Sequence, residues 1–174
     1  TSGGDNYLIG SNAGGELSTG SSNIAIGNIA LDTATTAGGN VAIGGTAGTA
    51  ITSGNTNVLI GYAAGAAIAS GTDNVALGTA CMDAVVTGTD NLGIGSSACT
   101  ALTSGTNNVI LGPVAAYALS SGSFNIVIGS SCAASLTTGS SNICLGYNAD
   151  CAAGATNAVN IGSTRQAATN ELML

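Results

Sequence analysis

A 17-residue repeat runs through almost the whole chain and limits the folds that are open to it. Each copy contains an asparagine, three further residues and then a glycine, and successive glycines lie 17 residues apart at Gly10, Gly27, Gly44, Gly61, Gly78, Gly95, Gly112, Gly129 and Gly146. A tenth, shortened copy ends 16 residues later at Gly162. Strict repeats of this kind are typical of solenoids, in which each unit buries its apolar residues against the next.

The residues between the asparagine and the glycine predict a short strand. The first and third of them are aliphatic in nearly every copy, as in Val41 and Ile43, so they share one face of a strand. We expect the middle residue to point outward, and it is never polar. An outward column this apolar predicts an oligomer interface in which other copies of the chain cover it. The predicted interface residues are Leu8, Ala25, Ala42, Leu59, Ala76, Gly93, Ile110, Val127 and Cys144.

The second half of each repeat has a different spacing. Alanine or cysteine stands three residues after the glycine, and a mostly aliphatic position follows four residues later. These aliphatic residues are Leu17, Ile51, Ile68, Val85, Leu102, Leu119 and Leu136. Spacings of three and four favour one or two turns of helix, and a Ser/Thr-Gly turn then closes the coil.

The sequence therefore predicts a β-solenoid, similar to a parallel β-roll, of about ten 17-residue coils. Each coil would contain a short strand and a short helical turn, and ten strands stacked at ~4.8 Å would give a rod of roughly 50 Å. We place an N-terminal edge at residues 1–5, the solenoid at 6–162 and a C-terminal cap or linker at 163–174, where Arg165 replaces the expected alanine. With no initiator methionine or signal peptide, the chain is expected to come from a longer precursor or a processing step.

The asparagine of each repeat has two possible roles. Asparagine tolerates turn geometry, and stacked amides hydrogen-bond from coil to coil, which favours a structural ladder. Nine exposed amides would instead form a row facing a glycan or ice. We favour the ladder because each asparagine stands where a strand begins. The ladder residues are Asn6, Asn23, Asn40, Asn57, Asn74, Asn91, Asn108, Asn125 and Asn142.

The charge balance excludes several partners. The chain has one Lys or Arg residue and no histidine against eight Asp and Glu residues, so it lacks the basic side chains that bind nucleic acid or an anionic membrane surface. The longest apolar run, 109–119, contains Gly112 and Pro113 and is too short to span a bilayer. We therefore predict no nucleic-acid partner and no membrane insertion.

The residue types also argue against an enzyme. No histidine is present to activate the serines or cysteines, and no lysine accompanies the glycine-rich turns to hold a phosphate. Asp73 and Asp90 share a column on adjacent coils, where they point into water or share a cation such as calcium. A paired-carboxylate hydrolase would need a cleft or an aromatic sugar platform, which does not accompany them. We predict no catalytic residues, no metal site and no cofactor.

The five cysteines lack the spacing of a zinc site. Cys81 and Cys99 are 18 residues apart, and Cys132 and Cys151 are 19 apart, so each pair falls on neighbouring coils. One interpretation is therefore two disulfides, Cys81–Cys99 and Cys132–Cys151, since stacked coils would place their α-carbons near the ~5–6 Å that such a bond requires; these bonds would indicate an oxidising compartment. The alternative is that they are buried free thiols replacing alanine.

Serine or threonine stands on both sides of the glycine in most closing turns, as in Thr87–Thr89 and Ser104–Thr106. These residues form parallel hydroxyl rows along the rod, which would bind ice or polysaccharide or carry O-linked sugars. The simpler interpretation is turn chemistry.

The unit Asn40–Gly44 resembles the repeats of trimeric autotransporter adhesin heads, which are parallel β-rolls whose three chains associate through their strand faces. The full unit from Asn57 to Asp73 is still more similar to repeats of phage tail-fibre-like proteins. The resemblance covers Asp5 to Gly162. It implies a homotrimeric fibre segment on a cell surface, outside the cell or on a virion, with an adhesive or spacer role.

Three hypotheses follow. The first is the structural fibre segment of an extracellular appendage or phage-like tail fibre. The second is the subunit of an extracellular filament that grows by end-to-end pairing of its terminal coils, since open solenoid ends invite association. The third is an ice- or glycan-binding solenoid that uses the hydroxyl rows and binds surface glycans.

Overall fold

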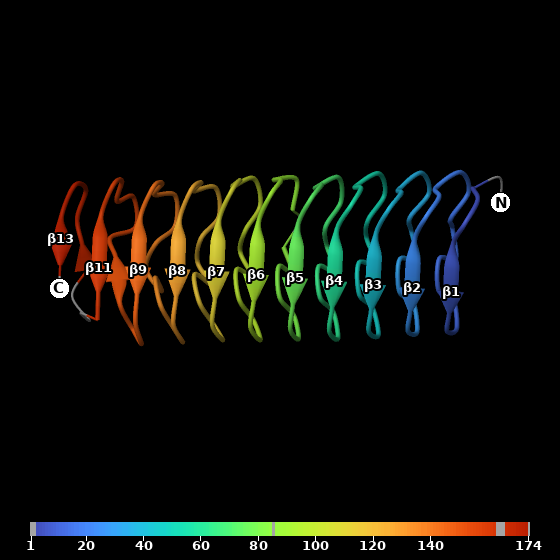
Figure 1. Cartoon of the computed structure of the whole chain (residues 1–174), viewed down its shortest axis with the longest axis horizontal. Helices are drawn as coiled ribbons and strands as arrows, with labels where there is room; N and C mark the ends of the chain where they lie inside the picture. Colours follow the sequence, from blue (N-terminus) through green and yellow to red (C-terminus); the bar gives the residue numbers. More distant parts are fainter. Residues whose placement is uncertain (1–2, 85, 163–165, 174) are drawn as a thin grey trace.

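The chain folds into a straight parallel β-solenoid with one strand of each coil stacked along the rod and the two termini at opposite ends (Figure 1). The computed structural model describes residues 3–84, 86–162 and 166–173. The main sheet contains β1 (Tyr7–Ile9), β2 (Ile24–Ile26), β3 (Val41–Ile43), β4 (Val58–Ile60), β5 (Val75–Leu77), β6 (Leu92–Ile94), β7 (Val109–Leu111), β8 (Ile126–Ile128), β9 (Ile143–Leu145), β11 (Val159–Ile161) and β13 (Leu172–Met173). A second, two-stranded sheet pairs β10 (Asp150–Cys151) with β12 (Gln166–Ala167).

The register of the sheet follows the repeat. From β1 to β9 each residue pairs with the residue 17 positions further on, as Val58 does with Val75. The described part of the C-terminal segment, 166–173, adds β12 beside β10 and β13 beside β11. It therefore continues the stack over the last coil, while Arg165 lies outside the described residues.

The middle residue of each strand points into the coil, so the predicted orientation of the strand is wrong. Of the nine residues predicted as an outward oligomer interface, the eight from Ala25 to Cys144 are buried. Leu8 is 40 % exposed because it belongs to the first coil of the described stack. The physical reason is the narrow interior of a 17-residue coil, where one side chain per strand fits and small residues fit best. The larger aliphatic residues on either side therefore face outward.

The core is packed by pairing large and small residues within a coil. The middle residue of a strand faces the residue six positions later, so Leu59 lies against Gly65 and the pair Ala76 and Met82 reverses the sizes. A Cβ atom on Gly65 would lie 2.7 Å from a methyl carbon of Leu59. Close packing of this kind leaves no room for an added methylene group.

The predicted helical turn is also wrong, because the described residues contain no helix. The second and fourth residues after the strand-ending glycine have positive φ angles instead, including Ile29 (φ 60°) and Val114 (φ 58°). This conformation costs a β-branched residue roughly 1–2 kcal/mol. It directs backbone groups to a neighbouring coil, as in the 2.9 Å bond from Ile29 N–H to Ser11 O on the preceding coil. The aliphatic positions of this half are buried as expected, except that Val85 lies outside the described residues.

The glycine that ends each regular strand is required by its backbone. Gly78 has a φ of 136°, a region that only glycine enters readily. A Cβ atom at this position would lie 2.6 Å from the carbonyl oxygen of Gly95 on the next coil. The coils therefore approach one another at a distance that no side chain would allow.

Candidate functional site

The asparagine column forms a continuous buried ladder, as the sequence predicts. The amide nitrogen of Asn57 donates to Asn40 Oδ1 at 3.0 Å and to Gly71 O at 2.9 Å, and the backbone N–H of Asn57 donates to the same Asn40 oxygen at 2.9 Å. The pattern repeats from Asn23 to Asn142, and these residues are at most 1 % exposed. Among the described residues no buried side-chain nitrogen or oxygen lacks a hydrogen-bond partner. Because the amides are buried and satisfied, they are structural and do not face a glycan or ice.

The ladder ends where the repeat shortens. Asn142 Oδ1 accepts a hydrogen bond of 3.0 Å from the backbone N–H of Ala158, which stands where the next asparagine would be. Asn160, at the inward position of β11, is buried and donates to Asp150 O at 2.6 Å. The last coil thus replaces the ladder with a single inward amide.

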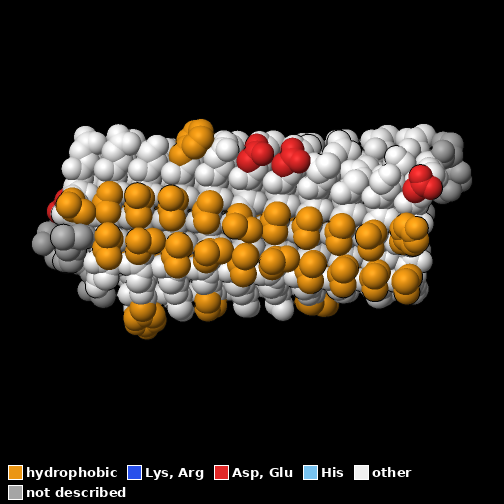
Figure 2. All heavy atoms as spheres, in the orientation of Figure 1, with side chains coloured by type: hydrophobic (Ala, Val, Ile, Leu, Met, Phe, Trp, Pro, Cys, Tyr) orange, Lys and Arg blue, Asp and Glu red, His pale blue; other side chains and the backbone are white. Residues whose placement is uncertain are grey.

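The outer face of the main sheet is apolar along the whole rod. The two residues that flank the inward position of each strand are half-buried or exposed, and Figure 2 shows them as two parallel rows with no charged side chain between them. We call these residues the outer rows. They are Tyr7, Ile9, Ile24, Ile26, Val41, Ile43, Val58, Ile60, Val75, Leu77, Leu92, Ile94, Val109, Leu111, Ile126, Ile128, Ile143, Leu145, Val159 and Ile161.

Sequence reasoning placed the outer rows in the core and so missed this surface. One sequence feature does indicate which face of the strand is outward. The middle residue of each strand and the residue six positions later vary in size together, as two residues in the core would. The large Leu59 is paired with the small Gly65, and the small Gly93 with the larger Cys99. The sizes vary in opposite directions because the two side chains of a pair share one narrow core.

The hydroxyl rows are largely used within the rod. Thr87 Oγ1 donates to Thr103 O at 3.3 Å, and Thr103 Oγ1 donates in turn to Ser120 O at 3.0 Å. Thr89 Oγ1 donates to Asp90 at 2.8 Å. These bonds favour turn chemistry over ligand binding.

Asp73 and Asp90, which share a column on adjacent coils, are both exposed. Asp73 accepts a hydrogen bond from the Thr56 hydroxyl, and Asp90 accepts one from Thr89. Their exposure agrees with the solvated interpretation of this column.

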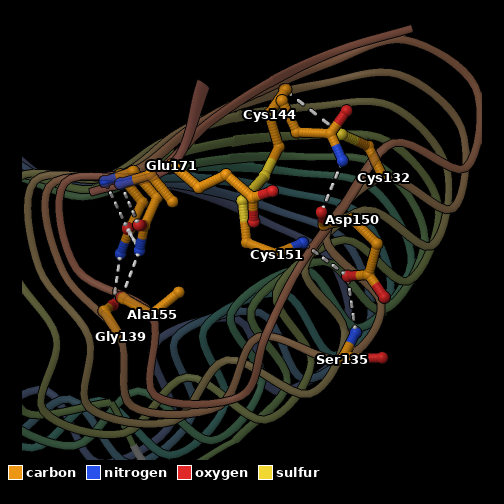
Figure 3. The surroundings of a disulfide bond; sticks show 12 residues. Cys132, Ser135, Gly139, Cys144, Asp150, Cys151, Ala155 and Glu171 are labelled. Atoms are coloured by element: carbon orange, nitrogen blue, oxygen red, sulfur yellow. Dashed lines mark hydrogen bonds between the residues drawn. A yellow bond between two sulfur atoms is a disulfide. The ribbon is translucent and has the colours of Figure 1, made fainter. Parts of the chain in front are cut away.

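The cysteines pair differently from the prediction. The structure contains a disulfide between Cys144 and Cys151, with α-carbons 6.9 Å apart, and Cys132 remains a buried thiol that donates to Cys144 O at 3.1 Å (Figure 3). The predicted Cys132–Cys151 bond is wrong because Cys144 points into the core, where it reaches Cys151. Cys81 and Cys99 are buried free thiols, so the free-thiol interpretation is confirmed for this pair and the bond between them is wrong.

The thiols of Cys81 and Cys99 occupy the space that Gly93 leaves in the core. A Cβ atom at Gly93 would lie 2.9 Å from Cys81 Sγ and 2.8 Å from Cys99 Sγ. The hydrogen bond with Cys81, together with burial, raises the pKa of Cys99 well above its ordinary value, and the same bond lowers the pKa of Cys81. Burial raises the pKa of Cys132 to about 11. The raised pKa values keep Cys99 and Cys132 protonated, and buried, protonated thiols are poor nucleophiles and metal ligands.

The described part of the chain contains no pocket and no group of three His, Cys, Asp or Glu residues placed to hold a metal ion. Nor do the described residues include a helix with the length and apolar character needed to cross a membrane.

The chain has no match among family models, curated proteins or solved structures.

Proposed function

We propose that this chain is a structural, non-catalytic segment of an extracellular, cell-surface or virion fibre, where it serves as a spacer or adhesive element and works with other copies of itself. The observation that carries the proposal is the unbroken in-register stacking of coils from β1 to β9. Each coil is tied to the next by the buried asparagine ladder and by backbone bonds, such as the 2.8 Å bond from Ile24 N–H to Asn40 O. A stack of this kind resists bending because each strand from β1 to β9 pairs directly with the next.

Changing the number of repeats tests the spacer role. Duplicating residues 57–107, which are three whole repeats, should lengthen the rod by about 14 Å at ~4.8 Å per strand. Small-angle X-ray scattering would measure the longest dimension. A matched insertion of the same length but scrambled sequence is the control, and it should not extend the rod. An unchanged length on duplication would contradict a spacer built from coils.

An end-to-end filament is the second proposal, supported by the exposure of β1. Tyr7 is 69 % exposed and Ile9 62 % exposed, and Leu8 from the inward column is 40 % exposed. A parallel strand from a second copy would cover this edge. Electron micrographs at rising protein concentration separate the proposals, because filament growth predicts fibrils that lengthen with concentration and a bundled fibre segment predicts short rods of fixed length.

A further inference from the structure

We infer that the outer rows form an interface between copies of this chain, with the outer face of one copy packed against the same face of a second. The inference rests on the proposed fibre role and deepens it, because it names the partner and the surface through which copies associate. It also replaces the interface that the sequence predicted, whose residues are in the core.

The exposed apolar area of the outer face is large enough for a protein–protein interface. Full burial of an aliphatic side chain contributes about 1.5–3 kcal/mol at about 25 cal/mol per Å², which corresponds to roughly 100 Å² per side chain. Seven of the twenty residues of the outer rows are 37–69 % exposed and the other thirteen are half-buried, so at about 100 Å² per side chain the rows together expose on the order of 600 Å². Free soluble proteins rarely exceed about 300–600 Å² in one apolar patch. Two such faces bury on the order of 1,200 Å², which is within the range of stable protein interfaces.

The shape of the face suits a second copy. The strands stack in register without a bulge, and Figure 2 shows that the outer rows run straight along the rod. A strongly twisted sheet would meet a partner over only part of its length. Two straight sheets can pack face to face, about 10 Å apart, along their whole length.

The chemistry of the face favours a copy of the chain over other occupants. The outer rows carry no charge, and Tyr7 is their only residue with a polar side-chain group. Sugars and nucleic acids would find almost no hydrogen-bond donors or acceptors there. Peripheral membrane surfaces usually surround apolar residues with Lys and Arg, whereas this chain has a net charge of −7 and a single basic residue. A second apolar sheet of the same length is the complementary surface.

Adding charge to the face tests the inference. Ile60→Lys with Ile94→Lys should convert an assembled wild-type protein into monomers, because two ammonium groups would be desolvated in the interface. The matched control, Ser53→Lys with Ser104→Lys, adds the same charge at exposed positions away from the outer rows and should assemble like the wild type. Sedimentation velocity should give at least a 100-fold difference between the variants in the concentration at half assembly, and circular dichroism checks that both are folded.

A second measurement does not depend on a disruptive variant. The chain has no tryptophan, so Ile94→Trp introduces a single reporter in the outer rows. Its emission should be blue-shifted in the assembled protein and move to the red on dilution, whereas the emission of Ser53→Trp should stay red throughout.

Three outcomes would overturn the inference. They are a wild-type protein that is monomeric at tens of micromolar, equal assembly of the two lysine variants, or a monomer that binds neutral phosphatidylcholine vesicles through the outer rows. Monomeric rods that still lengthen when repeats are added would overturn this interface but leave the spacer function intact, so the two failures are distinguishable.

Discussion

The regular coils and the last coil are held together by different interactions. In the regular coils the asparagine ladder and the strand-ending glycine recur without change, and neighbouring coils satisfy one another. In the last coil Ala158 interrupts the ladder and Asn160 brings an amide to the inward position. Immediately before it, a disulfide joins Cys144 of β9 to Cys151 of β10. The comparison suggests that repetition provides stability where neighbours exist on both sides, and that individual bonds replace it where the repeat ends.

Removing an amide from the middle of the ladder should have the largest effect. Asn74 donates to Asn57 Oδ1 and Gly88 O, and its own oxygen accepts two bonds from Asn91. Asn74→Leu should lower the free energy of unfolding by about 3–5 kcal/mol because it leaves several buried partners unsatisfied.

The matched variant for this prediction is Asn160→Leu in the last coil. It should cost about 1–2 kcal/mol, since the affected amide has no ladder to interrupt. Urea unfolding followed by circular dichroism measures both variants. Equal losses would mean that the ladder adds nothing beyond a single buried amide.

Substituting the strand-ending glycines should have the next largest effect. Gly78→Ala adds a methyl group at a φ of 136° and 2.6 Å from a backbone oxygen, so we expect a loss of about 3 kcal/mol. Gly162 has a φ of 72° and nothing within 4 Å of an added Cβ, so Gly162→Ala should cost about 1 kcal/mol. Thermal unfolding would rank the two variants, and a larger loss at Gly162 would contradict the close approach of the regular coils.

Reduction of the disulfide should act only on the C-terminal end of the stack. The Cys144–Cys151 bond closes a short loop with a sequence separation of 7, so reduction should cost about 2 kcal/mol by loop entropy. Hydrogen exchange should become faster around β9 and β10 when a reducing agent is added but stay unchanged around β4 and β5. A protein with both cysteines changed to alanine should not respond to the reducing agent. Faster exchange throughout the rod would show that the last coil holds the whole stack together.

Alkaline pH should have the smallest effect. The pKa of Cys132 is raised to about 11 in the folded chain, and an unfolded cysteine has a pKa near ~8.5. The folded state therefore favours the protonated thiol. The stability from this group is fully present below the unfolded pKa and is lost as pH rises toward 11, by roughly 1 kcal/mol between pH 9 and pH 10. Cys132→Ala should flatten the fall in melting temperature between pH 9 and pH 10. An unchanged slope would place the pKa of this thiol near its ordinary value.

The sequence predicts the parts of this fold that depend on period alone. The strand positions, their register and the asparagine ladder follow from residues that recur every 17 positions. The period does not indicate which side of each strand faces solvent. A three-residue strand such as Val58–Ile60 is apolar on both sides, so no polar residue identifies the exposed side. The helical turn failed because the spacing of three and four also fits two consecutive turns with positive φ. The disulfide was missed because its formation depends on Cys144 pointing inward.

The in-register stacking also has a genetic consequence. A deletion or duplication of any 17 consecutive residues within the regular coils leaves each remaining column next to an equivalent one, so recombination between repeats can change the length of the rod by about 4.8 Å at a time. A crossover between an inward residue and its partner six positions later would combine residues from two different pairs. It could place two large side chains, such as Leu59 and Met82, in the space of one large and one small residue. Length variation in such a gene should therefore occur in whole repeats, with breakpoints in the closing turns.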